Sequence, residues 1–344
     1  MCLHKKIIGC VIVLTVLIVG EFWPVHTVLS QDLDAIRSIA WKPDGTEFAT
    51  GHTGGKVTIW DAATRQPRLT FDVAPGHTQA LVVFSLAWSP DGSTLAAATS
   101  LGGGSVRLLD PATGALLDTF KAETLSTAVA WSPDGSLLAG GASRGLGFIS
   151  EGWVRVWDVA TGQVIAEILN GGGDTSNVSD LAWSADGSRL ACASINWAVI
   201  WDTATWETVF TLEHPATRLD HLGLEATNSV SAVAWSPQGS RLATGDADTI
   251  RIWDGFSGEL LATFDNAGHP LSLAWSPSGT QLASATLDVQ IWDVATGQLL
   301  EEFPGLAGVV AWSPDGTQIA YDGDGGLPEI VTPPTPAPTP TPCR

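Results

Sequence analysis

Basic residues are scarce in this chain of 344 residues. Lysine and arginine number 16 against 36 aspartates and glutamates, which gives a formal net charge of -20, and no basic run interrupts the acidity. A phosphate-rich partner would be repelled, so the composition argues against nucleic acid as a partner. The acidic residues are spread out, largely in turns, which is typical of a solvated surface.

Cysteine is also rare, and its placement excludes a disulfide framework. Of the four cysteines, Cys2 and Cys10 lie in an apolar N-terminal segment, Cys192 lies in a strand-like segment, and Cys343 is next to last. Disulfide-stapled domains need a regular cysteine spacing that is absent here. Five histidines show no metal-ligand spacing either: His26, His52, His77, His214 and His221. We therefore expect no metal and no other cofactor.

Tyrosine and methionine occur once each, whereas tryptophan occurs 16 times, mostly in repeats. Seven tryptophans stand in variants of the hexapeptide Ala-Trp-Ser-Pro-Asp-Gly, 37 to 52 residues apart: Trp41, Trp88, Trp131, Trp183, Trp235, Trp275 and Trp312. Five more precede an aspartate in a second motif: Trp60, Trp157, Trp201, Trp253 and Trp292. Self-similarity at this period indicates one supersecondary unit stacked on copies of itself. The tryptophans therefore indicate core packing more than an exposed aromatic surface.

The fifth copy, residues 231–264, shows what each repeat contains. Alternating residue character predicts four short strands separated by turns that contain glycine or proline. The expected strands are Ala232–Trp235, Arg241–Thr244, Thr249–Trp253 and Glu259–Phe264. A four-stranded sheet with two apolar faces is unstable alone in water, but it becomes one blade of a propeller when copies pack on both sides. The sequence therefore predicts an all-β fold, a seven-bladed β-propeller of four-stranded antiparallel blades.

The repeats resemble those of the WD-repeat β-propeller family, and the chain looks like a bacterial exported member. The name-giving Trp-Asp dipeptide stands in five copies, and Leu109-Asp110 replaces it in the second. In that family a His, a Ser or Thr, an Asp and the Trp form a buried hydrogen-bonded tetrad. The resemblance implies such a structural tetrad in the sixth copy: His269, Ser284, Asp288 and Trp292. Their places in the repeat favour this over a catalytic interpretation, so we expect no catalytic residue.

The resemblance implies a non-catalytic scaffold for protein-protein interaction, with a protein or peptide as its partner. Two alternatives stay open. One is a propeller enzyme of the hydrolase or lactonase type with a metal in the central channel, although the first strands offer few residues that could bind it. The other is a sensor module of a larger envelope protein, which the bare C-terminus suggests.

The ends of the chain predict export. Residues 1–20 contain two lysines and an uncharged apolar stretch, the pattern of a signal peptide or membrane anchor, with cleavage points after Gly20 and Ser30. We expect a secreted or cell-envelope protein that touches a membrane only through this segment, if it stays uncleaved. We expect residues 21–332 to form the propeller and residues 333–344 to form a Thr/Pro-rich disordered tail. The seventh blade lacks a fourth strand, and Trp23–Ser30 has the composition to complete it.

Differences between the copies locate the expected binding face. The turns that carry the hexapeptide are nearly identical, whereas the loops on the opposite side vary widely in length. Binding residues concentrate in variable loops on a rigid scaffold. We expect a partner-binding surface between blades three and five, with aromatic anchors and an acidic rim. Its predicted residues are Phe148, Trp153, Trp197, Arg218, Asp220, His221, Asp246 and Asp248. In a competing interpretation, the two tryptophans pack between blades.

Overall fold

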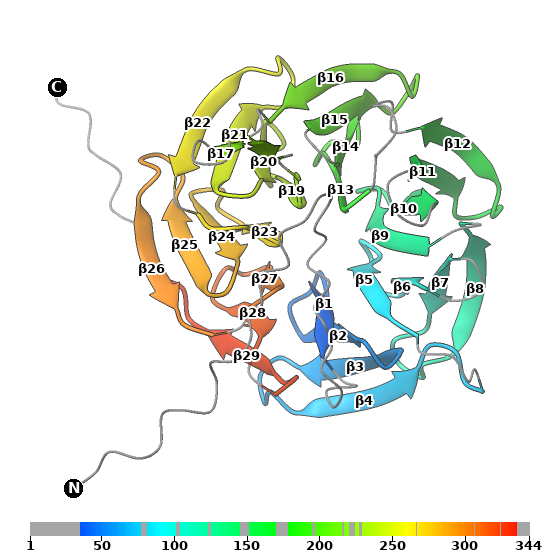
Figure 1. Cartoon of the computed structure of the whole chain (residues 1–344). Coiled ribbons are helices and arrows are strands. Elements are labelled where there is room, and N and C mark those ends of the chain that lie inside the picture. The colour runs from blue at the N-terminus through cyan, green and yellow to red at the C-terminus, as the bar shows by residue number, and fades with distance from the viewer. Residues whose placement is uncertain are drawn as a thin grey trace, which may run out of the picture.

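Seven β-sheets are arranged in a ring around a central axis in the computed structural model (Figure 1). The structure describes residues 35–335 except 77–80, 101–103, 123–124, 145–150, 170–177, 195–196, 215–216, 220–223, 227–228, 266, 306 and 324. Six sheets of the ring have four antiparallel strands in sequence order, and the seventh has three described strands. The predicted all-β, seven-bladed propeller is therefore confirmed.

Each blade begins at its innermost strand and ends at the circumference. Blade one comprises β1 (Ile36–Trp41), β2 (Glu47–His52), β3 (Lys56–Asp61) and β4 (Pro67–Asp72). Blade two comprises β5 (Val83–Trp88), β6 (Leu95–Thr99), β7 (Ser105–Leu109) and β8 (Leu116–Lys121). Blade three comprises β9 (Leu125–Trp131), β10 (Leu137–Arg144), β11 (Glu151–Asp158) and β12 (Val164–Leu169). Blade four comprises β13 (Asp180–Trp183), β14 (Arg189–Ala193), β15 (Trp197–Asp202) and β16 (Thr208–Glu213).

A two-stranded hairpin, β17 (Thr217–Leu219) and β18 (Leu224–Ala226), is inserted before blade five. Blade five comprises β19 (Ala232–Trp235), β20 (Arg241–Gly245), β21 (Thr249–Asp254) and β22 (Leu260–Asp265). Blade six comprises β23 (Ser272–Trp275), β24 (Gln281–Ala285), β25 (Val289–Asp293) and β26 (Leu299–Phe303). Blade seven comprises β27 (Val310–Trp312), β28 (Ile319–Asp322) and β29 (Pro328–Val331). The strands of blade five begin and end within one residue of the predicted positions.

The first turn of each blade explains why the hexapeptide recurs. In blade three, Asp134 Oδ1 accepts hydrogen bonds from Ser132 Oγ (2.6 Å) and from the backbone N–H of Ser136 (3.0 Å). Gly135 follows with a φ of 72°, in the left-handed region that glycine tolerates best. The Ser-Pro-Asp-Gly segment thus closes a tight turn with its own polar groups.

The hydrophobic core lies between the blades. Between blades one and two, Ala49, Val57 and Ile59 of the first blade pack in one cluster with Val83 and Leu95 of the second. Because both faces of a blade are apolar, each blade buries its side chains only against its neighbours.

The tryptophans of the hexapeptide also join neighbouring blades. At five junctions among the described residues, the indole Nε1–H donates to a backbone carbonyl of the preceding blade. The pairs are Trp41 and Ala311 (3.1 Å), Trp88 and Ala40 (3.0 Å), Trp131 and Ala87 (3.1 Å), Trp183 and Ala130 (3.1 Å), and Trp275 and Ala234 (2.9 Å). The bond from Trp41 to Ala311 closes the ring, because it joins blade one to blade seven.

The proposed N-terminal closing strand, Trp23–Ser30, lies outside the described residues, so its pairing with blade seven stays a prediction. The signal peptide or anchor predicted for residues 1–20 lies outside them too. At the other end, residues 333–335 of the predicted tail are described, and the carbonyl of Pro334 accepts a hydrogen bond from Gln281 Nε2 (3.1 Å). No helix in the described part of the chain is long and apolar enough to cross a membrane.

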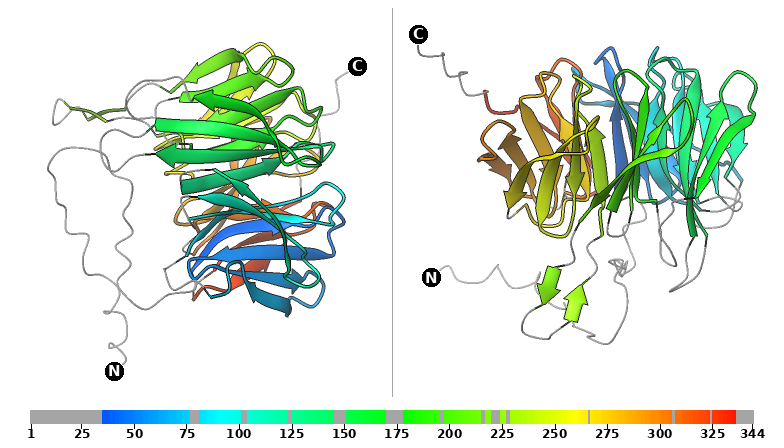
Figure 2. Two further views of the ribbon diagram at one scale, coloured as in Figure 1. Left: turned by 90° about the vertical axis from the view of Figure 1, so that its right-hand side faces the viewer. Right: turned by 90° about the horizontal axis from the view of Figure 1, so that it is seen from above.

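The ring has two faces. The turn face carries the connections from first to second and from third to fourth strands, and the loop face carries the other connections. The hairpin of β17 and β18 stands away from the ring on the loop face (Figure 2). The connection between blades varies on this face from residues 122–124 to residues 214–231.

Candidate functional site

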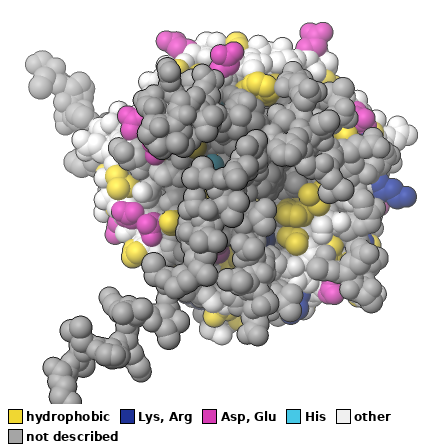
Figure 3. Space-filling model, viewed as in Figure 1, with side chains coloured by type: hydrophobic (Ala, Val, Ile, Leu, Met, Phe, Trp, Pro, Cys, Tyr) yellow, Lys and Arg dark blue, Asp and Glu magenta, His cyan; other side chains and the backbone are white. Residues whose placement is uncertain are grey.

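The predicted partner-binding residues do not form one exposed surface. Phe148, Asp220 and His221 lie outside the described residues, and Arg218 lies in β17 with its side chain outside them. On the loop face, described acidic side chains lie mostly around the circumference (Figure 3). Of the predicted acidic rim, Asp248 is exposed.

The two predicted aromatic anchors pack between blades. Trp153 is 7% exposed and lies in a core cluster with Phe120 of blade two and Trp157 of its own blade. The prediction that Trp153 is an exposed anchor is therefore wrong, because its indole fills the space between two blades. Trp197 is half-buried at the loop-face end of β15 and packs against the cluster between blades three and four. Of the two, only Trp197 presents part of its ring to solvent beyond the core.

A complete buried tetrad lies in blade five, although the sequence pattern predicted one in blade six. Trp253 Nε1–H donates to Thr244 Oγ1 (2.8 Å), and Thr244 Oγ1 lies 3.0 Å from His214 Nε2. His214 Nδ1 lies 2.9 Å from Asp246 Oδ2. This chain of bonds is satisfied when His214 is neutral, with its proton on Nδ1 and an acceptor at Nε2. His214 was missed because it follows β16 and reaches blade five only in three dimensions.

Asp246 is therefore a structural residue, and its predicted place in an acidic binding rim is wrong. It is 1% exposed and forms an ion pair with Arg251, and its Oδ1 accepts hydrogen bonds from the backbone and hydroxyl of Thr249 (both 2.9 Å). Burial alone would raise the pKa of Asp246, but hydrogen bonds from His214 and the backbone, with the charge of Arg251, lower it well below its usual value.

The tetrad predicted in blade six forms only in part. Trp292 Nε1–H donates to Ser284 Oγ (2.9 Å), as expected. His269 instead lies with Nε2 3.0 Å from Ser231 Oγ of blade five, and Asp288 Oδ1 accepts from the backbone N–H of Gly305 (3.1 Å). His269 stands only just before β23, so it meets the neighbouring blade before it can reach Ser284. The four residues do not form one network.

A half-buried carboxylate joins blade four to blade five. In blades one, two and six a serine near the start of the first strand accepts a hydrogen bond from the backbone of the next blade: Ser38 from Leu86 (2.8 Å), Ser85 from Val129 (3.3 Å) and Ser272 from Val310 (3.3 Å). Asp180 takes this place in blade four, where Oδ2 accepts from the N–H of Val233 (3.1 Å). Burial raises the pKa of Asp180 to about 6, against the opposite effect of two backbone N–H groups.

The described residues offer no ready metal centre. No group of three or more His, Cys, Asp or Glu side chains in this part of the chain could hold a metal ion. Cys192 is fully buried in β14, and burial raises the pKa of its thiol, which suits an inert packing residue.

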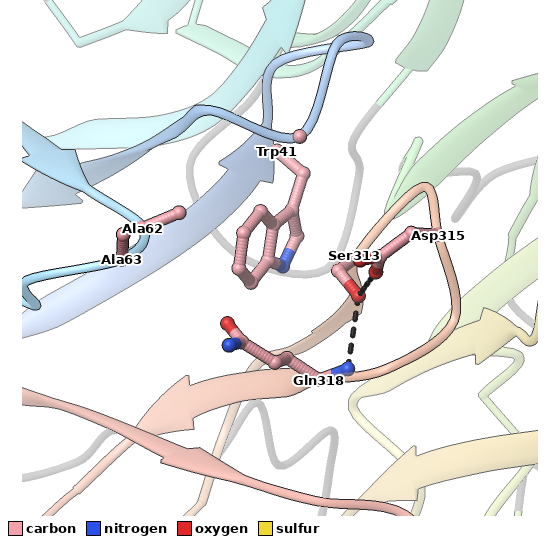
Figure 4. A pocket seen from close by; sticks show the side chains of 7 residues that line it. Trp41, Ala62, Ala63, Ser313, Asp315 and Gln318 are labelled. Atoms are coloured by element: carbon pink, nitrogen blue, oxygen red, sulfur yellow. Dashed lines mark hydrogen bonds between the residues drawn. The ribbon is translucent and has the colours of Figure 1, made fainter.

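A cavity of about 170 Å³ opens at the junction of blades seven and one, on the turn face (Figure 4). Blade one contributes Trp41, Gly45, Ala62 and Ala63, and blade seven contributes Ser313, Asp315 and Gln318. The Trp41 indole and the Gln318 amide approach each other across it. The near-identical hexapeptide turns predicted a uniform face, and no site was expected here.

Two known protein families match the repeats of this chain. The WD domain, G-beta repeat family matches residues 23–61, 114–158, 165–202, 217–254 and 258–293. The Anaphase-promoting complex subunit 4 WD40 domain matches residues 71–132.

Curated relatives come from a fungus and a plant. Protein HIR1 of Cryptococcus neoformans is 29% identical over 245 residues, which cover 67% of this chain and 22% of that protein. THO complex subunit 3 of Arabidopsis thaliana is 27% identical over 316 residues, which cover 86% of this chain and 89% of that protein. WD repeat-containing protein VIP3 of the same plant is 32% identical over 126 residues. The chain spans only about a fifth of HIR1 and less than two fifths of VIP3.

Proposed function

Because the chain belongs to the WD40 repeat family, we propose that it is a non-catalytic scaffold that binds a protein or peptide on its loop face. Family membership supports an interaction role, and the name of one relative, THO complex subunit 3, describes a subunit of a complex. The observation that carries the choice of face is the contrast in connections. Turns on the opposite face repeat one motif, whereas loop-face connections differ from blade to blade.

The inserted hairpin adds to this support. β17 and β18 pair with each other and with no other strand among the described residues. An isolated two-stranded hairpin is marginally stable in water and gains stability when another surface covers it. Its two outer edges pair with no described strand, and free strand edges are templates for a partner's backbone.

Beside the hairpin, the described part of the loop face presents exposed side chains on blades four to six. Leu287 is 69% exposed and Leu271 is 37% exposed, and both belong to blade six, while the exposed Asp248 belongs to the neighbouring blade five. Trp197 adds a half-buried aromatic edge. We define these four residues as the loop-face surface. Apolar side chains with a polar rim are the usual energetic centre of a protein interface.

The test is capture of a partner from an extract of the source organism by the immobilised full chain. Leu287→Lys should lose the partner that the unchanged protein retains, because a charge replaces the most exposed apolar side chain of the loop-face surface. The matched control is Leu117→Lys, which changes a 56% exposed leucine on the outer strand β8. Equal capture by both variants would refute the proposed surface.

Export to the cell envelope remains part of the proposal, and the residues that support it are the lysines and apolar stretch of residues 1–20. N-terminal sequencing of the protein from its source decides this. A mature chain that begins at Glu21 supports export with the closing strand kept, and one that begins at Gln31 supports export but removes Trp23–Ser30. An intact Met1 in a soluble fraction would contradict the proposal.

A further inference from the structure

The cavity on the turn face differs from a plain gap in its chemistry. One wall is the indole ring of Trp41, which the Gln318 amide faces, and the Asp315 carboxylate lies beside Ser313, whose hydroxyl donates to it (Figure 4). Gln318 Oε1 is buried and accepts no hydrogen bond from the described residues. A buried acceptor without a donor is costly, and this oxygen gains a partner if the Gln318 amide turns toward an N–H or O–H donor that enters the cavity. Cavities of about 150 Å³ hold molecules of the size of benzene, so a side-chain end fits here.

The neighbouring junction shows what fits. Residues 41–47, Trp-Lys-Pro-Asp-Gly-Thr-Glu, and residues 312–318, Trp-Ser-Pro-Asp-Gly-Thr-Gln, differ at only two positions. At the junction of blades one and two, Lys42 Nζ lies 3.0 Å from Asp44 Oδ2 and 3.7 Å from Glu47 Oε2. The same nitrogen lies 6.0 Å from the centre of the Trp88 ring.

Each of these partners has a counterpart around the cavity. Asp315 stands for Asp44, Gln318 for Glu47 and Trp41 for Trp88 in the repeat. Lys42 also packs on Gly92, where a methyl group would lie 3.0 Å from Lys42 Cε. The counterpart glycine, Gly45, lines the cavity, and a methyl group there would lie 3.8 Å from Pro314 Cδ. The cavity at the junction of blades seven and one therefore corresponds to the space that the Lys42 side chain fills at the junction of blades one and two.

The charge of the turn face favours a cation there. Hydrogen bonds from Ser313 and Thr317 lower the pKa of Asp315, so its carboxylate is ionised at neutral pH. The corresponding turns of blades one to four carry four more exposed carboxylates: Asp44, Asp91, Asp134 and Asp186. An ammonium group over the face of a tryptophan gains cation–π stabilisation as well. The Trp41 ring, the oxygen acceptors of Asp315 and Gln318 and the negative charge of the turn face all favour a positively charged hydrogen-bond donor.

We propose that the cavity at the junction of blades seven and one is a docking site for a lysine side chain of a partner protein. The ammonium group lies between Asp315 and Gln318, and its methylene stem lies on Trp41 and Gly45. The site is on the face opposite the loop-face surface, so the scaffold can hold a basic segment on one face while it binds a second partner on the other.

The experiment uses the full chain labelled with 15N in its indole groups. The Trp41 Nε1–H signal is assigned through Trp41→Phe and followed during titration with N-acetyl-lysine methylamide. A saturable shift of this signal is expected, and the Nζ-acetylated probe, which has no charge, should leave it unchanged. Asp315→Asn should weaken binding roughly fivefold, the upper range for one exposed ion pair. An equal response to the neutral probe, or no response to either probe, would overturn the proposal.

Two substitutions exchange the junctions. Ser313→Lys gives blade seven the Trp-Lys-Pro-Asp-Gly turn of blade one, so the new lysine should fill the cavity and abolish the response to the probe. Ser132→Lys adds the same charge at the corresponding position of blade three, and binding should persist. Lys42→Ser should create a second site, visible as a new saturable shift of Trp88. Retained binding in Ser313→Lys, with a native spectrum elsewhere, would refute the assignment of the site.

Discussion

The turn face and the loop face of this ring are built in different ways. One short motif repeated seven times makes the turn face, whereas connections of unequal length and sequence make the loop face. On the turn face the proposed site lies at the junction of blades seven and one, where Ser313 and Gln318 stand at the positions that Lys42 and Glu47 hold in blade one. On the loop face the two tryptophans near strand ends, Trp153 and Trp197, pack in or against the core between neighbouring blades. Depth between two blades therefore decides the role of a residue more than the face on which it lies.

The largest effect should come from a loop-face residue that lies deep. Trp153→Ala should lower the free energy of unfolding by about 3–5 kcal/mol, because it removes a buried indole and leaves a cavity between blades two and three. Urea unfolding followed by circular dichroism measures this. Trp197→Ala, on a half-buried ring, is the comparison and should cost less. A loss below that of Trp197→Ala would contradict the assignment of Trp153 to the core.

The buried tetrad should give the next largest effect. Asp246→Asn should cost about 1.5–3 kcal/mol, because hydrogen bonds to a charged group become neutral ones. The folded-state pKa of Asp246 is lowered, so its contribution is present above the unfolded pKa of about 3.9 and is lost as the pH falls through the folded value. Unfolding at a series of pH values tests this. The difference between Asp246→Asn and the unchanged protein should shrink in acid; a constant difference would speak against a charged Asp246.

Asp180 should show the opposite pH dependence. Its folded-state pKa is raised to about 6, so the folded state binds the proton more tightly than the unfolded state. The contribution of Asp180 to the free energy of unfolding should therefore fall as the pH rises from about 4 to 6, with a slope of at most about 1.4 kcal/mol for each unit of pH. Asp180→Ser, which introduces the residue found in blades one, two and six, should remove this contribution and leave that of Asp322, whose pKa burial also raises to about 6. Parallel pH profiles for the two proteins would show that the carboxylate is not desolvated.

The smallest effect on stability should come from the residue that matters most for binding on the loop face. Leu287→Lys should change the free energy of unfolding by less than about 0.5 kcal/mol, because the side chain is exposed. Leu117→Lys should behave alike. Thermal unfolding of both variants measures this, and a marked loss in Leu287→Lys alone would mean that its effect on partner capture reflects folding.

Repetition explains how much of the structure could be predicted. Seven tryptophan motifs predicted seven blades, and local turn chemistry placed the strands of blade five to within one residue. The same logic failed for side chains that leave their own blade. His214 follows one blade and bonds within the next, while His269, the predicted tetrad member, bonds to Ser231. Spacing along the chain carries no information on which neighbour a loop residue reaches.

The fold class, the number of blades and the self-contained Ser-Pro-Asp-Gly turns could all be predicted from the sequence, because they depend on contacts within a few residues or on a period that repeats. The tertiary structure alone decided which residues are buried between blades and which junction keeps a cavity. Trp153 and the Trp41–Gln318 junction both depend on side chains from two blades, and in the second case those side chains are far apart in the chain. Packing between blades depends on side chains from two neighbouring repeats, and the sequence of one repeat contains only one side of each contact.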